Sequence, residues 1–153
     1  MRVAVAFDHA GFPLKADVIA AIHAAGHETV DLGTNSTDPV DYPDFAEKLA
    51  HAINSGVALR GVFVCGSGVG ASIAANKLTG LYAGLCHDIY SARQGVEHDN
   101  MNVLCLGARI IGPALVPELI QAFLSAEFST DMRHHRRVGK ILQLEEHGTT
   151  GTE

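Results

Sequence analysis

The chain has 153 residues, of which 47% are hydrophobic and 18% charged, and this balance predicts one globular domain large enough to bury a core. Its formal net charge of -6 argues against a surface for nucleic acid or an anionic membrane, so an anionic ligand would need a local basic cluster. No apolar stretch approaches the roughly 20 residues of a membrane span, and the N-terminal run lacks a signal-peptide pattern. The 3 cysteines are widely spaced without a CxxC pair, which indicates a reducing compartment, and we expect the protein in the cytoplasm.

Short apolar runs alternate with longer stretches of helical period, a pattern typical of an α/β fold with a parallel sheet. Strands are predicted, in chain order, over residues 3–7, 28–32, 61–65, 81–86 and 103–106. Helices are predicted from Pro13 to about Gly26, from a cap at Asp44 to Asn54, and over 71–77, 88–97, 112–125 and 133–146. The third strand is apolar throughout and should be central. We expect a single domain over residues 1–146 and a disordered polar tail over 147–153.

Polar residues follow four of the predicted strands directly. They are Asp8 and His9, the glycine-rich loop Cys65-Gly66-Ser67-Gly68-Val69-Gly70, the pair His87-Asp88, and Arg109. Ligands of open parallel sheets bind at the carboxyl ends of the strands, so one crevice could gather several of these side chains.

The glycine-rich loop fits three interpretations. Its alternating glycines between a strand and a helix let backbone N–H groups point at an anion or a developing oxyanion. The same letters also match a dinucleotide fingerprint, G-x-G-x-x-A, with Asp88 about 20 residues further on. The third interpretation is a tight turn without chemistry.

Cys65 favours chemistry at this loop. A cysteine at the end of a buried strand is usually a small hydrophobic residue, but this one precedes a nest of N–H groups at a helix N-terminus. Such a position favours the thiolate and lowers the pKa of the thiol. Cys86 and Cys105 lie inside strand patterns, and we expect them to serve packing.

Three further groups are candidates for chemistry, each beside a plainer interpretation. Asp8 suits proton transfer or the capping of the next helix. His98, followed by Asp99-Asn100, suits acid–base work near neutral pH. Arg133 and Arg137 lie one helical turn apart and would grip a phosphate together, or belong to a solvated helix face.

No metal site is expected from the 9 histidines, because no HExxH and no paired Cys/His spacing occurs. His134 and His135 are adjacent on a predicted helix and therefore point in different directions. Five histidines are most simply surface residues, namely His23, His27, His51, His135 and His147.

These clusters, in this order, resemble the ribose-5-phosphate isomerase B and galactose-6-phosphate isomerase family over residues 1 to about 142. The motifs that carry the resemblance are Asp8-His9-Ala10-Gly11, Asp41-Tyr42-Pro43, Cys65 to Gly70 with Ser72-Ile73-Ala74-Ala75-Asn76-Lys77, Asn102-Val103-Leu104, Gly107-Ala108-Arg109, and Arg133-His134 with Arg137. The ordered set is much more specific than any one motif.

The resemblance implies a Rossmann-like three-layer α/β/α sandwich with five parallel strands and a C-terminal helical arm. It also implies aldose–ketose isomerisation of a sugar phosphate, without metal or organic cofactor, in a homodimer or tetramer with sites at the dimer interface. By similarity Cys65 is the base, Asp8 handles hydroxyl protons and His98 opens the sugar ring. For the enediolate, the resemblance implies Ser67 and the backbone amides of Gly66, Gly68, Val69 and Gly70. For the phosphate it implies His9, Arg109, Arg133 and Arg137, with Arg133 and Arg137 reaching over from the partner. Asp99, Asn100 and Tyr42 are implied as further residues of the pocket.

The sequence departs from the common family pattern at two places. Asp99-Asn100 stands where many members have Asn-Asp, and Asp131-Met132 stands where Gly-Gly is usual. The first departure leaves the sugar open among ribose 5-phosphate, galactose 6-phosphate, allose 6-phosphate and a tetrose phosphate. A nucleotide-binding module and a sugar-phosphate sensor without turnover are the alternatives from other classes.

Overall fold

The computed structural model describes residues 1–148 and contains one five-stranded parallel sheet. The strands are β1 (Arg2–Phe7), β2 (Glu28–Asp31), β3 (Arg60–Cys65), β4 (Ala83–Leu85) and β5 (Val103–Gly107), in the order β2-β1-β3-β5-β4. The predicted α/β class, strand number and central third strand are therefore confirmed. The predicted fourth strand was too long at both ends.

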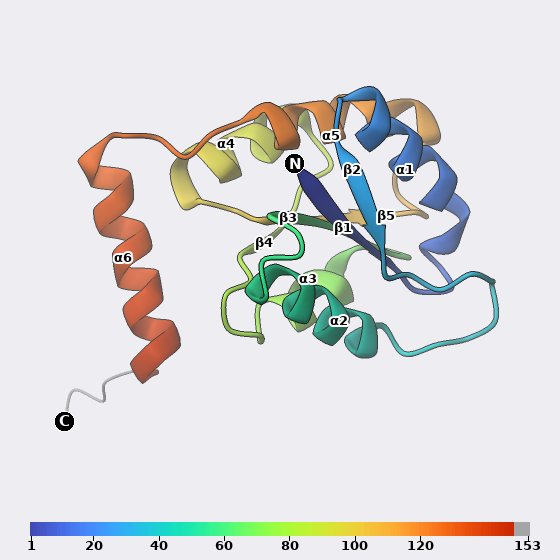
Figure 1. Ribbon diagram of the computed structural model, residues 1–153, viewed down its shortest axis with the longest axis horizontal. Coiled ribbons are helices and arrows are strands. Elements are labelled where there is room, and N and C mark those ends of the chain that lie inside the picture. Colours follow the sequence, from blue (N-terminus) through green and yellow to red (C-terminus); the bar gives the residue numbers. More distant parts are fainter. Residues whose placement is uncertain (149–153) are drawn as a thin grey trace.

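Helices cover both faces of the sheet, which makes the expected three-layer sandwich (Figure 1). One face packs against α1 (Lys15–Ala24), α4 (Ile89–Asp99) and α5 (Val116–Ser125), and the other against α2 (Tyr42–Asn54) and α3 (Val69–Ala75). Short 3₁₀ turns, Phe12–Leu14 and Pro113–Leu115, lead into α1 and α5. The alternation of side chains along β1 explains the two cores, since Val3, Val5 and Phe7 face the first and Ala4 and Ala6 the second.

Two helices begin earlier than predicted. The cap of α2 is Asp41, not Asp44, because the proline of the first turn follows Tyr42 and is tolerated there. Helix α3 begins at Val69, directly after Gly68, whose φ of 77° lets the chain turn without the strain that a side chain would add. Both shifts bring a helix start closer to the carboxyl edge of the sheet.

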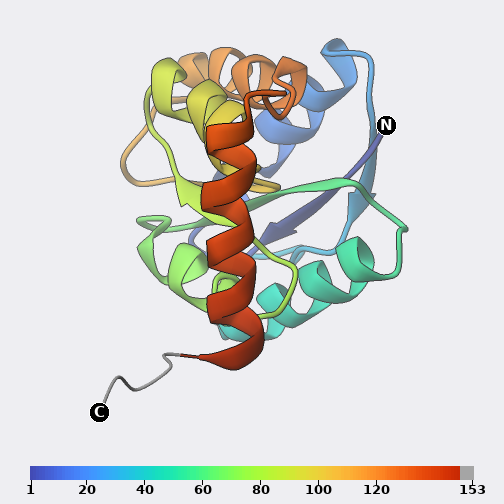
Figure 2. The same cartoon turned by 90° about the vertical axis from the view of Figure 1, so that its left-hand side faces the viewer.

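Helix α6 (Met132–His147) stands apart from the sandwich as an arm (Figure 1). It runs along one side of the molecule, from the layer of α4 and α5 toward that of α2 and α3 (Figure 2). Only His134 and Val138 of this helix are buried. Its far end is held by Glu145, which accepts hydrogen bonds from the Gly80 N–H at 3.1 Å and the Tyr82 hydroxyl at 3.2 Å. The helix includes His147, which was predicted to belong to the polar tail, and residues 149–153 of that predicted tail lie outside the described part of the chain.

Candidate active site

The first polar residues after β1 are held by the turn that follows the strand. Asp8 is 4% exposed, and its Oδ1 accepts hydrogen bonds from the backbone N–H groups of Ala10 at 2.9 Å and Gly11 at 2.8 Å. The carboxylate thus stabilises the turn itself and, contrary to the plainer interpretation, does not cap the next helix, and it has a second oxygen for other work. The Nδ1 of His9 accepts the N–H of Val40 at 3.2 Å, so the proton of the neutral ring is on Nε2.

The glycine-rich loop places a backbone donor on the sulfur of Cys65. The N–H of Gly68 lies 3.1 Å from Sγ, and the thiol is 5% exposed. Ser67 is exposed and its hydroxyl accepts the N–H of Val69 at 3.2 Å. A donor aimed at sulfur stabilises negative charge there, so the local geometry suits a thiolate.

Tyr42 and Arg109 flank this loop. A Cβ added at Gly70 would lie 2.8 Å from the Tyr42 ring, and one added at Gly66 would lie 3.4 Å from a guanidinium nitrogen of Arg109. The Arg109 backbone N–H also donates to the Gly66 carbonyl at 2.9 Å. The glycines therefore allow an aromatic ring and a cation to approach the loop closely.

The other predicted residues lie elsewhere. His98 and Asp99 end α4, and Asn100 follows with a left-handed φ of 53°, just before β5 begins. The His98 ring stacks on that of His134 in α6, with centroids 4.0 Å apart and planes 20° apart. Arg133 flanks His134 on the same helix, where its Nε lies 3.0 Å from the carboxylate of Asp131.

The residues around the 65–70 loop and the residues around His98 lie at opposite edges of the sheet. Cys65 pairs in register with Gly107 at the carboxyl end of β5, whereas His98 precedes Val103 at its amino end. At about 3.3 Å per residue, β5 alone separates the two groups by roughly 13 Å. One protomer therefore unites Asp8, His9, Tyr42, the 65–70 loop and Arg109, but does not bring His98, Asp99, Asn100, Arg133 or Arg137 to Cys65.

Asp88 has a structural function that removes the main support for a dinucleotide site. Its carboxylate accepts the N–H of Ser91 at 2.7 Å and so caps α4. This hydrogen bond lowers the pKa of Asp88. The neighbouring His87 accepts the N–H of Gly107 at 2.9 Å through Nε2, and burial lowers its pKa, so the ring is held neutral at the end of β5.

The three cysteines are free and buried, but they differ in character. Burial raises the pKa of Cys86 to about 11 and that of Cys105 further still. Neither thiol lies in a setting that favours the anion, in agreement with their expected role in packing.

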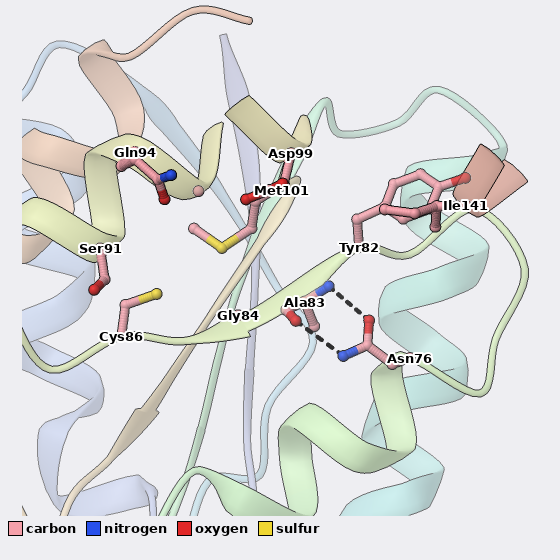
Figure 3. A pocket seen from close by; sticks show the side chains of 11 residues that line it. Asn76, Tyr82, Ala83, Gly84, Cys86, Ser91, Gln94, Asp99, Met101 and Ile141 are labelled. Atoms are coloured by element: carbon pink, nitrogen blue, oxygen red, sulfur yellow. Dashed lines mark hydrogen bonds between the residues drawn. The ribbon is translucent and has the colours of Figure 1, made fainter. Parts of the chain in front are cut away.

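A pocket of about 350 Å³ opens on the side of the molecule that carries α6 (Figure 3). Gln94 and Asp99 of α4 line it together with Met101, which lies between α4 and β5, and Tyr82 and Ile141 lie across the opening. Asn76 closes its floor through paired hydrogen bonds to the backbone of Ala83, both 2.9 Å long. Sequence reasoning missed this pocket and the roles of Gln94 and His134, because α6 packs here through contacts that are distant in sequence.

Within residues 1–148, no three His, Cys, Asp or Glu side chains converge as a metal site would require. In the same part of the chain, no helix combines the length and apolar character needed to cross a membrane.

Sheet order and site geometry define an open α/β protein with a glycine-rich loop and an adjacent cysteine, at the point between β1 and β3 where ligands of such folds bind. Residues 3–141 match the model of the family described as Ribose/Galactose Isomerase. The chain therefore belongs to this family, as an enzyme of the ribose-5-phosphate isomerase B type, which confirms the resemblance.

Relatives with different named substrates are similar to this chain. The ribose-5-phosphate isomerase B of Escherichia coli is 39% identical over 95% of this chain and 97% of its own. The D-erythrulose-4-phosphate isomerase of Pectobacterium atrosepticum is 42% identical over 84% of this chain and 85% of its own. The structure of Clostridium thermocellum ribose-5-phosphate isomerase B superposes with a TM-score of 0.92 at 41% identity, covering 97% of this chain and all of that one.

Proposed function

We propose that this enzyme interconverts ribose 5-phosphate and ribulose 5-phosphate through an enediolate, with Cys65 as the base. The thiolate removes the proton from C2 of the open-chain aldose, and that electron pair forms the C1–C2 double bond while the C1 carbonyl pair moves to O1; loss of the O2 proton then gives the enediolate. An O2 pair next forms the C2 carbonyl, the C1–C2 π pair takes the proton from Cys65 at C1, and O1 regains a proton. The observation that carries this proposal is the Gly68 N–H held 3.1 Å from the Cys65 sulfur at the start of an anion-binding loop. A base needs stabilisation of its reactive form beside donors for the developing oxyanion, and this loop supplies both.

Residues around the loop suit the remaining steps. The second carboxylate oxygen of Asp8 would exchange protons with the sugar hydroxyls. Ser67 and the loop amides would hold the enediolate oxygens. His9, with its proton on Nε2, and Arg109 would donate to the phosphate, since charge-assisted hydrogen bonds are the stronger ones.

We further propose that the complete site forms between two protomers, with His98, Asp99, Asn100, Arg133 and Arg137 all supplied by the partner. The support is that these residues share one edge of the protomer while Cys65 lies at the other. The sequence resemblance implies that only the two arginines cross the interface, whereas the stack of His98 on His134 keeps His98 with the arm as well.

Exposed apolar side chains agree with such a dimer. They lie in α3, at β4 and the start of α4, after β5, and along the arm, namely Val69, Ile73, Leu85, Ile89, Tyr90, Ile110, Ile141, Leu142 and Leu144. Exposed apolar side chains that form a large patch mark protein–protein interfaces. Three free cysteines fit the cytoplasm as the compartment.

A tetrose phosphate is the second candidate substrate. The Pectobacterium relative named for erythrulose 4-phosphate is 42% identical, and Asp99-Asn100 departs from the Asn-Asp order common in the family. A carboxylate at position 99 would accept hydrogen bonds from sugar hydroxyls where an amide would both donate and accept.

The test is a panel of pentose, hexose and tetrose phosphates assayed for aldose–ketose exchange with the purified enzyme. We expect the largest kcat/KM for ribose 5-phosphate. A larger value for a tetrose phosphate would transfer the assignment to that substrate. No exchange with any of them would contradict isomerase activity in this chain.

A further inference from the structure

His98 is held by a side chain that the family motifs do not include. Gln94 lies one helical turn before it on α4, and the Gln94 amide nitrogen is 2.8 Å from Nδ1 of His98. An amide nitrogen only donates, so Nδ1 must accept, and the proton of the neutral imidazole is then on Nε2. The contact therefore sets the tautomer as well as the orientation of the ring.

A second contact sets the plane of the same ring. His134 is 3% exposed and stacks on His98 at a centroid distance of 4.0 Å. Its own Nδ1 is buried without a hydrogen-bond partner. His134 therefore serves as a flat platform beneath His98, and the guanidinium of Arg133 on the same helix adds positive charge that opposes protonation of the His134 ring.

We propose that Gln94 is a positioning residue that fixes His98 as a neutral imidazole with its proton on Nε2, so that His98 is a hydrogen-bond donor to the ring oxygen of a furanose and not a base. This inference rests on the proposed role of His98 in ring opening. Gln94 also lines the pocket beside α6, so its amide lies next to the surface that would meet a partner (Figure 3).

The chemistry of ring opening fits a neutral donor. The C1–O4 bond breaks, its electron pair goes to O4, and O1 loses a proton as the C1 carbonyl forms. Water carries that proton to O4, so the step neither gains nor loses protons overall. His98 lowers the barrier by donating from Nε2 to the charge that develops on O4.

Two substitutions separate the tautomer from simple support of the ring. Gln94→Met preserves the length of the side chain but removes the donor. Gln94→Glu preserves the size and a hydrogen bond, but a carboxylate accepts, so it would move the imidazole proton to Nδ1. If Gln94 only anchors the ring, Gln94→Glu should behave like the wild type.

The first readout is the nitrogen NMR spectrum of the ¹⁵N-histidine-labelled full chain, with the His98 signals assigned by their loss in His98→Asn. We expect an unprotonated Nδ1 and a protonated Nε2 in the wild type, a mixture in Gln94→Met, and the reverse in Gln94→Glu. A protonated Nδ1 in the wild type, or one tautomer in all three proteins, would overturn the proposal. This readout needs no activity, so it stands even where the proposed function fails.

The second readout is kinetic. Ribulose 5-phosphate cannot close a furanose ring because the hydroxyl required carries the phosphate, so exchange of its C1 proton with solvent bypasses ring opening. We expect both Gln94 variants to slow conversion of ribose 5-phosphate about tenfold while exchange from ribulose 5-phosphate falls by less than twofold. Equal losses in both assays would overturn the proposal in favour of a structural role. A wild type without either reaction would instead contradict the proposed function.

Discussion

The imidazole of His98 at the end of α4 stacks on that of His134 in the arm, at 4.0 Å between centroids. This contact joins the sandwich to the helix that carries Arg133 and Arg137. A change in the position of α6 would therefore move the proposed ring-opening residue and both proposed phosphate ligands together. The arm is also held at its far end by Glu145, so it is fixed at two points along its length.

His134 should make stability depend on pH. Burial first, and then the nearby His98 and Arg133, lower its pKa, while Asp131 acts in the opposite direction. A group whose pKa is lower in the folded state binds fewer protons there, so its contribution to stability is complete above the unfolded value of about 6.5 and is lost as the pH falls through it. We expect the urea midpoint of the wild type to be lower at pH 5.5 than at pH 7.5.

The control for this prediction is His134→Phe, which keeps a flat ring for His98 but cannot titrate. Its urea midpoint should fall less over the same pH interval, although His87, whose pKa is also lowered, continues to contribute. An identical fall in both proteins would contradict an effect of His134.

His134→Ala removes the platform as well and should reduce kcat about tenfold, whereas His134→Phe should not.

Cys65→Ala should abolish exchange of the C1 and C2 protons and leave phosphate binding nearly unchanged. The reason is that in the proposed mechanism the sulfur moves the proton, while His9 and Arg109 remain to hold the phosphate. We expect a loss of at least about a thousandfold in kcat, as for other removed catalytic bases. Solvent exchange followed by proton NMR, with inorganic phosphate binding measured by calorimetry, checks both parts.

Cys86→Ala is the matched control, because this thiol is also buried but its pKa of about 11 keeps it protonated. It should retain kcat within about twofold, apart from a modest loss of stability for the smaller side chain. Near-wild-type exchange in Cys65→Ala would assign the proton transfer to another base.

Arg137→Ala should raise KM for the sugar phosphate about tenfold with a smaller change in kcat. One charge-assisted hydrogen bond has a free energy of about 1.5–3 kcal/mol, and 1.4 kcal/mol corresponds to tenfold. Arg136→Ala is the control, since adjacent residues on a helix point in different directions and both arginines are exposed. Equal KM values for the two variants would place Arg137 on a solvated helix face.

The sequence predicted the sheet and one half of the site, but not how the other half is arranged. β1, β3 and β5 are largely buried apolar runs, and residues that follow parallel strands lie at one edge of the sheet, which is why the sequence could place Asp8, Cys65 and Arg109 near one another. His98 was grouped with them by motif alone. Its position depends on α6, whose packing on α4 is set by tertiary contacts such as the stack on His134 and leaves no periodic signal near residue 98.

Mixed dimers test whether the site is shared. Cys65→Ala and His98→Asn should each be inactive alone, because each removes one essential group from both sites. After the two proteins are unfolded and refolded together in equal amounts, half of the dimers are mixed. Each mixed dimer has one intact site, with Cys65 from one protomer and His98 from the other. We therefore expect about a quarter of the wild-type kcat per chain.

The same mixture distinguishes the alternative geometry directly. If one protomer supplied both groups, no combination of the two variants would restore an intact site, and the refolded mixture would be as inactive as its parents. A mixture of Cys65→Ala with Arg109→Ala is the control, because both of these residues flank the same loop. The activity of that mixture should not exceed the mean of its two parents, since the two groups lie in one protomer and cannot complement each other across the interface.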